Sequence, residues 1–132
     1  MSYQFPNLLA RVREFLDTAL TEPVHAIRTP AGATYPLVLV TAVSTAPLTG
    51  ATDKLAQARI QVECYGQTAQ DEAASWALAA RAHLAFHGIS NEPDFSGFTT
   101  ETGPQLIPDR ELGKARHIFD VRVYGYTPRQ VI

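Results

Sequence analysis

The segment Arg59–His87 constrains the fold most, because a two-residue period changes into a helical period within it. In its first seven residues apolar and polar side chains alternate, which is typical of a strand with one buried face. The alanine-rich part that follows predicts a helix that stops at Gly88. Asp71 lies three residues after Thr68, as in a capping box, and puts negative charge near the start of this helix. The sequence therefore predicts a strand that leads directly into the longest helix of the chain.

The remaining sequence predicts a second helix and further strands. Apolar residues at helical spacing indicate an amphipathic helix over Asn7–Leu20. Leu37–Ser44 is apolar on both faces and is expected to be a central strand, and Arg116–Tyr126 alternates as clearly as the first strand. His25–Thr29 is expected to form a short strand and turn.

Two segments between these elements are expected to be loops. Thr45–Gln57 is rich in Ser, Thr, Pro, Gly and Ala and is longer than a hairpin needs. Gly88–Ala115 contains dispersed glycines and prolines, and only Leu106 and Ile107 indicate a short strand. A segment this long with little regular structure is typical of one that binds something.

The 132 residues predict a single domain over residues 1–132. Short connections between strands favour a mostly antiparallel sheet of about four to five strands with two helices on one face, an α+β two-layer sandwich. The net charge of −2 gives no reason to expect nucleic acid as a specific partner. No run approaches the ~20 apolar residues of a membrane span, and the N-terminus does not resemble a signal peptide, so the protein is expected to stay in the cytoplasm.

The titratable residues do not form a recognisable catalytic set. Cys64 is the only cysteine, which excludes an intrachain disulfide, and its place in the alternating pattern predicts a core residue. His83 and His87 have the four-residue spacing of metal-binding pairs, but no acidic residue follows the first, as the zinc protease motif requires. This favours half-buried histidines at a sheet edge or an interface. We therefore predict no enzyme and no catalytic, cofactor-binding or metal-binding residue.

The polar faces of the two alternating strands are expected to pair across an antiparallel ladder, with tyrosines together at one end. The charged residues are Arg59 and Glu63 on the first strand, and Arg116, Asp120 and Arg122 on the second. The tyrosines are Tyr65, Tyr124 and Tyr126. A solvated sheet face and a subunit interface both fit this pattern, because interfaces favour tyrosine and arginine.

The long helix is apolar on two sides. One stripe contains Ala69, Ala73, Trp76, Ala77, Ala80 and Leu84, and the opposite side contains Ala74, Leu78, Ala82 and Ala85. A helix of this kind needs cover on both sides, and the chain has only one other helix to offer. We expect another subunit to supply the missing cover, with Ala74, Leu78 and Ala82 in the contact.

Two runs of the sequence resemble a known family. ARIQVECYGQTAQDEAASWALAARAHL, followed after a loop by RHIFDVRVYGY, is similar to the tail-terminator, or tail-completion, minor tail proteins of long-tailed bacteriophages. The matching residues are Arg59, Gln61, Val62, Glu63, Cys64 and Tyr65, then Ala79, Arg81 and Leu84, and finally Phe119, Val121, Arg122, Val123 and Tyr124. The resemblance covers about two thirds of the chain.

The resemblance implies a structural virion protein without cofactor. Such proteins form a homo-oligomeric ring, usually a hexamer, that caps the tail tube at its head-proximal end and offers a surface for head joining; they are assembled in the host cytoplasm. The implied partners are the tail-tube protein and a head-completion, or neck, protein; no membrane is involved, and DNA passes through the ring.

A ring needs two different patches on each subunit. One is expected to contain Ala74, Leu78, Arg81 and Ala82, and the other Arg59, Glu63, Tyr65, Arg122, Tyr124 and Tyr126. Loop residues expected to reach neighbours or the ring lumen are Asp53, Lys54, Asp109, Arg110, Glu111 and Lys114. Two alternatives remain: a head–tail connector (neck) protein of similar size, and a stand-alone ligand-binding or enzymatic domain that uses Arg81, His83 and His87 near the loop Ser90–Arg116.

Overall fold

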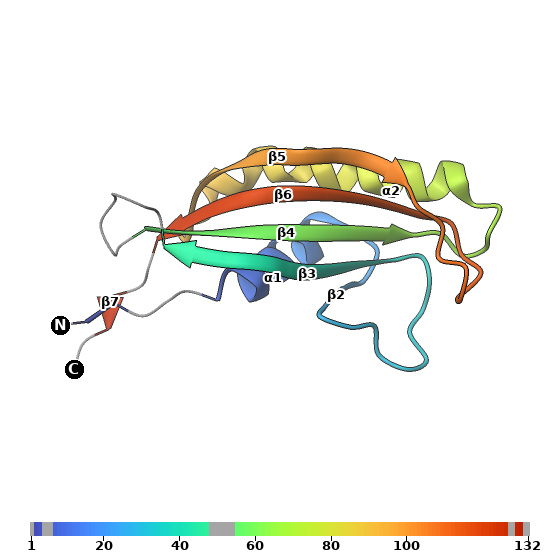
Figure 1. Cartoon of the computed structure of the whole chain (residues 1–132), viewed down its shortest axis with the longest axis horizontal. Helices are drawn as coiled ribbons and strands as arrows, with labels where there is room; N and C mark the ends of the chain where they lie inside the picture. Colours follow the sequence, from blue (N-terminus) through green and yellow to red (C-terminus); the bar gives the residue numbers. More distant parts are fainter. Residues whose placement is uncertain (1, 4–6, 48–54, 127–128, 131–132) are drawn as a thin grey trace.

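The computed structural model describes residues 2–3, 7–47, 55–126 and 129–130, which form a five-stranded sheet, a two-stranded sheet and two α-helices (Figure 1). In chain order the elements are β1 (Ser2–Tyr3), α1 (Leu8–Ala19), β2 (Val24–Ala26), β3 (Leu37–Pro47), β4 (Leu55–Tyr65), α2 (Glu72–Ala85), the 3-10 helix η1 (Phe86–Asn91), β5 (Phe95–Leu106), β6 (Arg116–Tyr126) and β7 (Arg129–Gln130).

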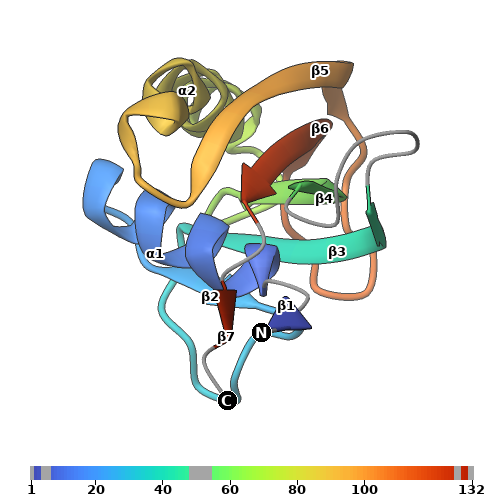
Figure 2. The ribbon, with the colours of Figure 1, turned by 90° about the vertical axis from the view of Figure 1, so that its left-hand side faces the viewer.

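The main sheet has the order β2-β3-β4-β6-β5, and only the β2–β3 pair is parallel. Both helices lie on one face, with α1 over β2 and β3 and α2 over β6, β4 and β5 (Figure 2). The core lies between these layers and is formed by Ile60, Val62, Phe119, Val121 and other apolar residues that the alternating patterns place inward. The predicted α+β two-layer sandwich is confirmed.

Helix α1 forms where the sequence predicts it. Asn7 caps it by accepting a hydrogen bond from the Ala10 N–H at 3.1 Å, and Leu8, Val12 and Leu16 are buried. Leu8 packs at Gly125 of β6, where an added Cβ would stand 2.6 Å from Leu8 Cδ2. A glycine at this position therefore lets the first turn of α1 approach the sheet closely.

Helix α2 begins at Glu72, four residues after the predicted cap at Thr68. The Asp71 carboxylate accepts hydrogen bonds from the N–H groups of Gln67 and Thr68, at 3.0 and 3.1 Å, so it stabilises the turn before the helix. The α-helix ends at Ala85, and η1 carries the chain past the predicted stop.

Two of the three α2 residues expected at a subunit contact are buried, whereas the third, Ala74, is exposed. Leu78 and Ala82, expected at a subunit contact, are 1% and 0% exposed and lie in the core of the subunit itself. The uncovered side is the other stripe, where Trp76 is 51% and Leu84 is 68% exposed. Small residues on the buried side let α2 lie close to the sheet. Ser75 lies on that side and forms a buried hydrogen bond with His117, with Ser75 Oγ and His117 Nδ1 2.7 Å apart.

The prediction that Gly88–Ala115 is mostly loop is wrong, because β5 is a twelve-residue edge strand within it. Three register shifts against β6 break the two-residue period that would reveal a strand. Gly103 and Pro104 are tolerated because β5 has a neighbour on one side only.

The strands β3 and β4 extend further than predicted. Ser44 to Pro47 pair with Arg59 to Ala56, so both ends of the expected loop Thr45–Gln57 are ladder residues. A register shift between Ala42 and Ser44 leaves Val43 at a bulge, with 55% of its surface exposed. No helix in the described part of the chain is long and apolar enough to cross a lipid bilayer.

Candidate functional surfaces

The outer face of the main sheet, which lies opposite the helices, carries paired charges. Arg59 Nη2 donates to Asp120 Oδ2 at 2.9 Å, and Arg116 Nη1 donates to Glu63 Oε1 at 3.0 Å. These pairs confirm the cross-strand ladder predicted for the two strands. Arg59 Nε is buried and has no acceptor among the described residues.

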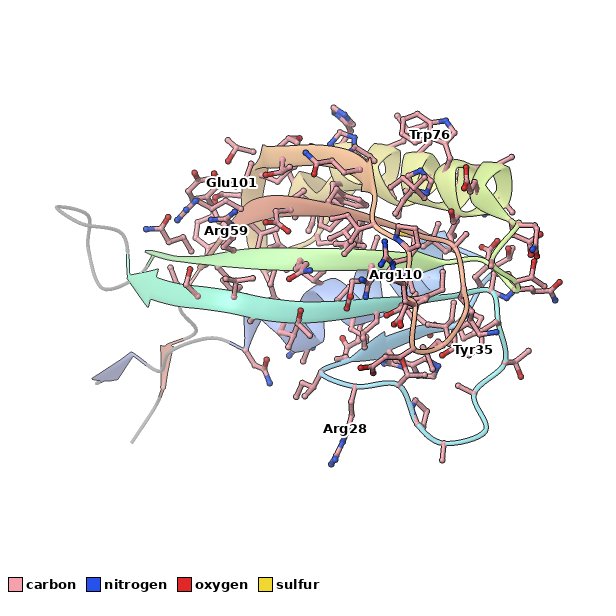
Figure 3. All side chains as sticks on the ribbon, turned by 45° about the vertical axis from the view of Figure 1, so that its right-hand side comes forward. Arg28, Tyr35, Arg59, Trp76, Glu101 and Arg110 are labelled. Atoms are coloured by element: carbon pink, nitrogen blue, oxygen red, sulfur yellow. The ribbon has the colours of Figure 1, made fainter. Side chains whose placement is uncertain are left out.

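Strand β5 extends this charged ladder. Arg122 Nε donates to Glu101 Oε1 at 2.6 Å, and its Nη1 donates to Gln57 Oε1 at 2.9 Å. Figure 3 labels Glu101 and Arg59, which lie near one another on this face. The hydrogen bond from Arg122 lowers the pKa of Glu101. Sequence reasoning missed Glu101 because it lies in the segment expected to be a loop.

The three tyrosines are not together, contrary to the prediction. Tyr65 pairs with Arg116 at one end of the β4–β6 ladder, whereas Tyr124 and Tyr126 pair with Gln57 and Leu55 at the other end. The reason is the antiparallel direction, which puts the end of β4 beside the start of β6.

The connection between β2 and β3 and the connection between β5 and β6 cover the outer face at the Tyr65 end. Tyr35 packs edge-on against Tyr65, with ring centroids 5.8 Å apart, and the Lys114 ammonium lies 4.2 Å from the Tyr35 ring centroid. Lys114 Nζ also donates to the Gln67 carbonyl at 2.7 Å. A second, smaller apolar cluster forms beneath, consisting of Leu37, Leu39 and Tyr65 with Ala33 and Tyr35 packed against it.

Four of the loop residues predicted to reach neighbours or the ring lumen lie in the connection between β5 and β6. Asp109 bridges to Lys114 through the backbone and lies 3.6 Å from the Arg116 guanidinium, so both loop residues are held within the subunit. Arg110 and Glu111 are exposed at the tip. Asp53 and Lys54 lie outside the described residues.

The partial burial of this end affects its charges. Burial raises the pKa of Glu63 above its ordinary value, even though the Arg116 guanidinium favours the ionised carboxylate. Burial likewise raises the pKa of the Tyr65 phenol. Cys64, on the opposite face of the same strand, is fully buried as predicted, and burial raises the pKa of its thiol well above the usual range.

Arg81 and the two histidines of the alternative ligand site have different partners. Arg81 forms a bidentate ion pair with Glu22, at 2.9 and 2.6 Å. His83 Nε2 lies 2.8 Å from Thr100 Oγ1, and the His83 and His87 rings are 6.1 Å apart. Burial, followed by the charge of His87, lowers the pKa of His83. The histidines therefore lie beside the edge strand β5, whereas Arg81 is paired with Glu22 in the turn after α1.

The described residues contain no group of three or more His, Cys, Asp or Glu side chains placed to hold a metal ion. Two open depressions of about 280 and 290 Å³ flank α1 and share Arg11, Glu14 and Asp94. In both, Arg11 and Asp94 form an ion pair, with Nε and Oδ2 3.2 Å apart. These are shallow, charged surfaces.

The comparisons with known proteins identify the family. The family described as "Tail completion protein gp17" matches residues 7–125, from the N-cap of α1 to the penultimate residue of β6. Among curated proteins, no sequence matches significantly. The family match includes the alternating strands β4 and β6, and also α2 and the edge strand β5, which lie between these two strands in the sequence. The chain therefore belongs to the tail completion protein gp17 family of bacteriophage tail proteins.

Proposed function

We propose that this protein completes the phage tail by forming a ring, a hexamer, on the head-proximal end of the tail tube. The ring stops further polymerisation of the tube and offers the surface that joins the neck protein of the filled head. The family match over residues 7–125 carries this proposal, since completion of the tail is the role that the family description states.

The subunit has properties that suit a structural, non-catalytic role. Its outer sheet face carries arginine and carboxylate side chains that are paired with one another, as in Arg59–Asp120 and Arg116–Glu63. The opposite charges on such a face balance one another, so DNA that passes through the ring is not held by it. The partners in this proposal are further copies of the chain, the tail-tube protein and the neck protein.

Tail assembly in the absence of this chain tests the proposal. Cells infected with a phage that lacks the gene are expected to accumulate tails of variable, excessive length that do not join heads. Supply of the wild-type chain restores one length and infectious particles. Tails of normal length that also join heads without the chain would overturn the proposal.

A further inference from the structure

Two exposed apolar surfaces lie at opposite edges of the subunit. The first, the outer α2 stripe, consists of Ala73, Trp76, Ala77, Ala80 and Leu84, all exposed. The second, the β2–β3 corner, contains Ile27 with 71% and Val43 with 55% of their surfaces exposed. The sheet order puts β2 and β3 at one edge and β5, beside α2, at the other. Figure 3 shows Trp76 projecting at one side and Arg28, next to Ile27, at the opposite side.

The two surfaces differ in the size of their side chains. Trp76 and Leu84 are eight residues apart, about 12 Å along the helix axis, and only alanines of the stripe lie between them. At the corner, Ile27 has φ 74°, which turns the chain out of β2 directly after its N–H donates to the Val40 carbonyl at 2.9 Å. The branched Ile27 side chain therefore projects from the edge and is of a size to lie over the alanines.

The charges beside the surfaces are complementary. Glu72 lies one helical turn before Trp76, on the same side of α2, and is exposed. Arg28 follows Ile27 and is exposed as well. Neither forms an ion pair with a described residue, in contrast to Arg59, Arg81, Arg116 and Arg122, whose guanidinium groups have carboxylate partners.

We propose that the β2–β3 corner of one copy packs on the outer α2 stripe of the next copy, with Arg28 paired to Glu72 across the contact. Because the two surfaces differ and face opposite ways, the contact is head-to-tail and closes into a ring when the rotation per subunit fits. The inference rests on the ring proposed above and specifies its contact. Burial of Trp76, Leu84 and Ile27 supplies the apolar centre, and the ion pair fixes the register.

Cysteine cross-linking on tails tests this contact. The chain carries Arg28→Cys and Glu72→Cys together, is incorporated into tails that lack the wild-type chain, and is treated with a bismaleimide cross-linker, because the Cα atoms of an Arg–Glu pair lie farther apart than a disulfide spans; Cys64 is buried and does not interfere. We expect a ladder of covalent oligomers that ends at the ring size, whereas each single variant gives no product larger than a dimer. A matched control combines Arg28→Cys with Asp17→Cys, an exposed position on α1, and is expected to give no ladder.

Interface variants complete the test. Leu84→Asp and Ile27→Asp change exposed side chains, so each variant is expected to remain folded, which circular dichroism checks. Each is expected to lower the number of copies of the chain incorporated per tail at least tenfold. Rings on tails without cross-links between positions 28 and 72 would overturn this contact and leave the proposed function intact. Loss of incorporation without such cross-links would assign the stripe to another tail protein and overturn it too. Wild-type tails without any ring would instead overturn the proposed function.

Discussion

The Arg81 guanidinium holds the Glu22 carboxylate through two hydrogen bonds, of 2.9 and 2.6 Å, and ties α2 to the turn between α1 and β2. This ion pair lowers the pKa of Glu22 to about 2, with the hydrogen bond from Arg81 as the main cause. It joins α2 to the segment that follows α1 in the chain. Arg81 therefore has a role inside the subunit, and its predicted place at a subunit contact remains untested.

Replacement of Glu22 by glutamine is expected to lower the free energy of unfolding by about 1 kcal/mol at pH 7, because the pair is partly exposed and screened by solvent. The folded pKa lies below the ordinary value of 4.5, so the contribution is complete above pH 4.5 and is lost as the pH falls toward 2. Urea unfolding across this range should show wild type and variant converging in acid. A constant difference at every pH would contradict the assignment.

The two leucines of α2 test which face is buried. Leu78→Ala is expected to cost about 2 to 5 kcal/mol of unfolding free energy, since Leu78 is 1% exposed and its loss opens a cavity in the core. Leu84→Ala, on the same helix but 68% exposed, is the matched control and should cost less than about 0.5 kcal/mol. Chemical denaturation of the two variants measures both values. Equal losses would contradict the observed packing of α2.

Gly125 sets how closely α1 approaches β6. An added Cβ would stand 2.6 Å from Leu8 Cδ2 and 2.9 Å from the Asp94 carbonyl oxygen, so Gly125→Ala is expected to cost about 1 to 3 kcal/mol. Gly103→Ala provides the control, because nothing lies within 4 Å of the corresponding Cβ. Thermal unfolding of the pair of variants gives the comparison, and an unchanged midpoint for Gly125→Ala would refute the close approach.

The buried Ser75–His117 pair predicts acid sensitivity. Burial lowers the pKa of His117 below 6.5, with a smaller opposing effect from Glu72. Because the folded state favours the neutral imidazole, stability is highest above pH 6.5 and declines as the pH falls from there toward the folded pKa. NMR titration should give a His117 pKa below 6.5, and His117→Gln should weaken the pH dependence between 7 and 5. The lowered pKa of His83 contributes to the pH dependence in the same direction. A His117 pKa above 6.5 would contradict the prediction.

Periodicity predicts those elements whose residues meet a single apolar layer. Both alternating strands and α1 are of this kind, and the cross-strand pairs Arg59–Asp120 and Glu63–Arg116 follow from the antiparallel register. Strand β5 could not be predicted this way. Its register shifts interrupt the alternation, and as an edge strand it buries few side chains.

The burial of α2 could not be predicted from composition, because both of its faces are apolar. The tertiary fit of Ser75, Ala79 and Ala82 against the sheet selects one face, and this fit depends on His117, which is 42 residues away from Ser75. The Glu22–Arg81 pair spans 59 residues and leaves no local signal for the same reason. The expectation of a second uncovered side was correct, but it belongs to the stripe that contains Trp76 and Leu84.

Cryo-electron microscopy of completed tails tests the central claim most directly. We expect one ring of this chain per tail, at the head-proximal end, with subunits into which the two-layer fold of residues 7–47 and 55–126 fits as a rigid unit. Density for the chain repeated along the tube, or located only at the distal tip, would contradict the claim that it completes the tail.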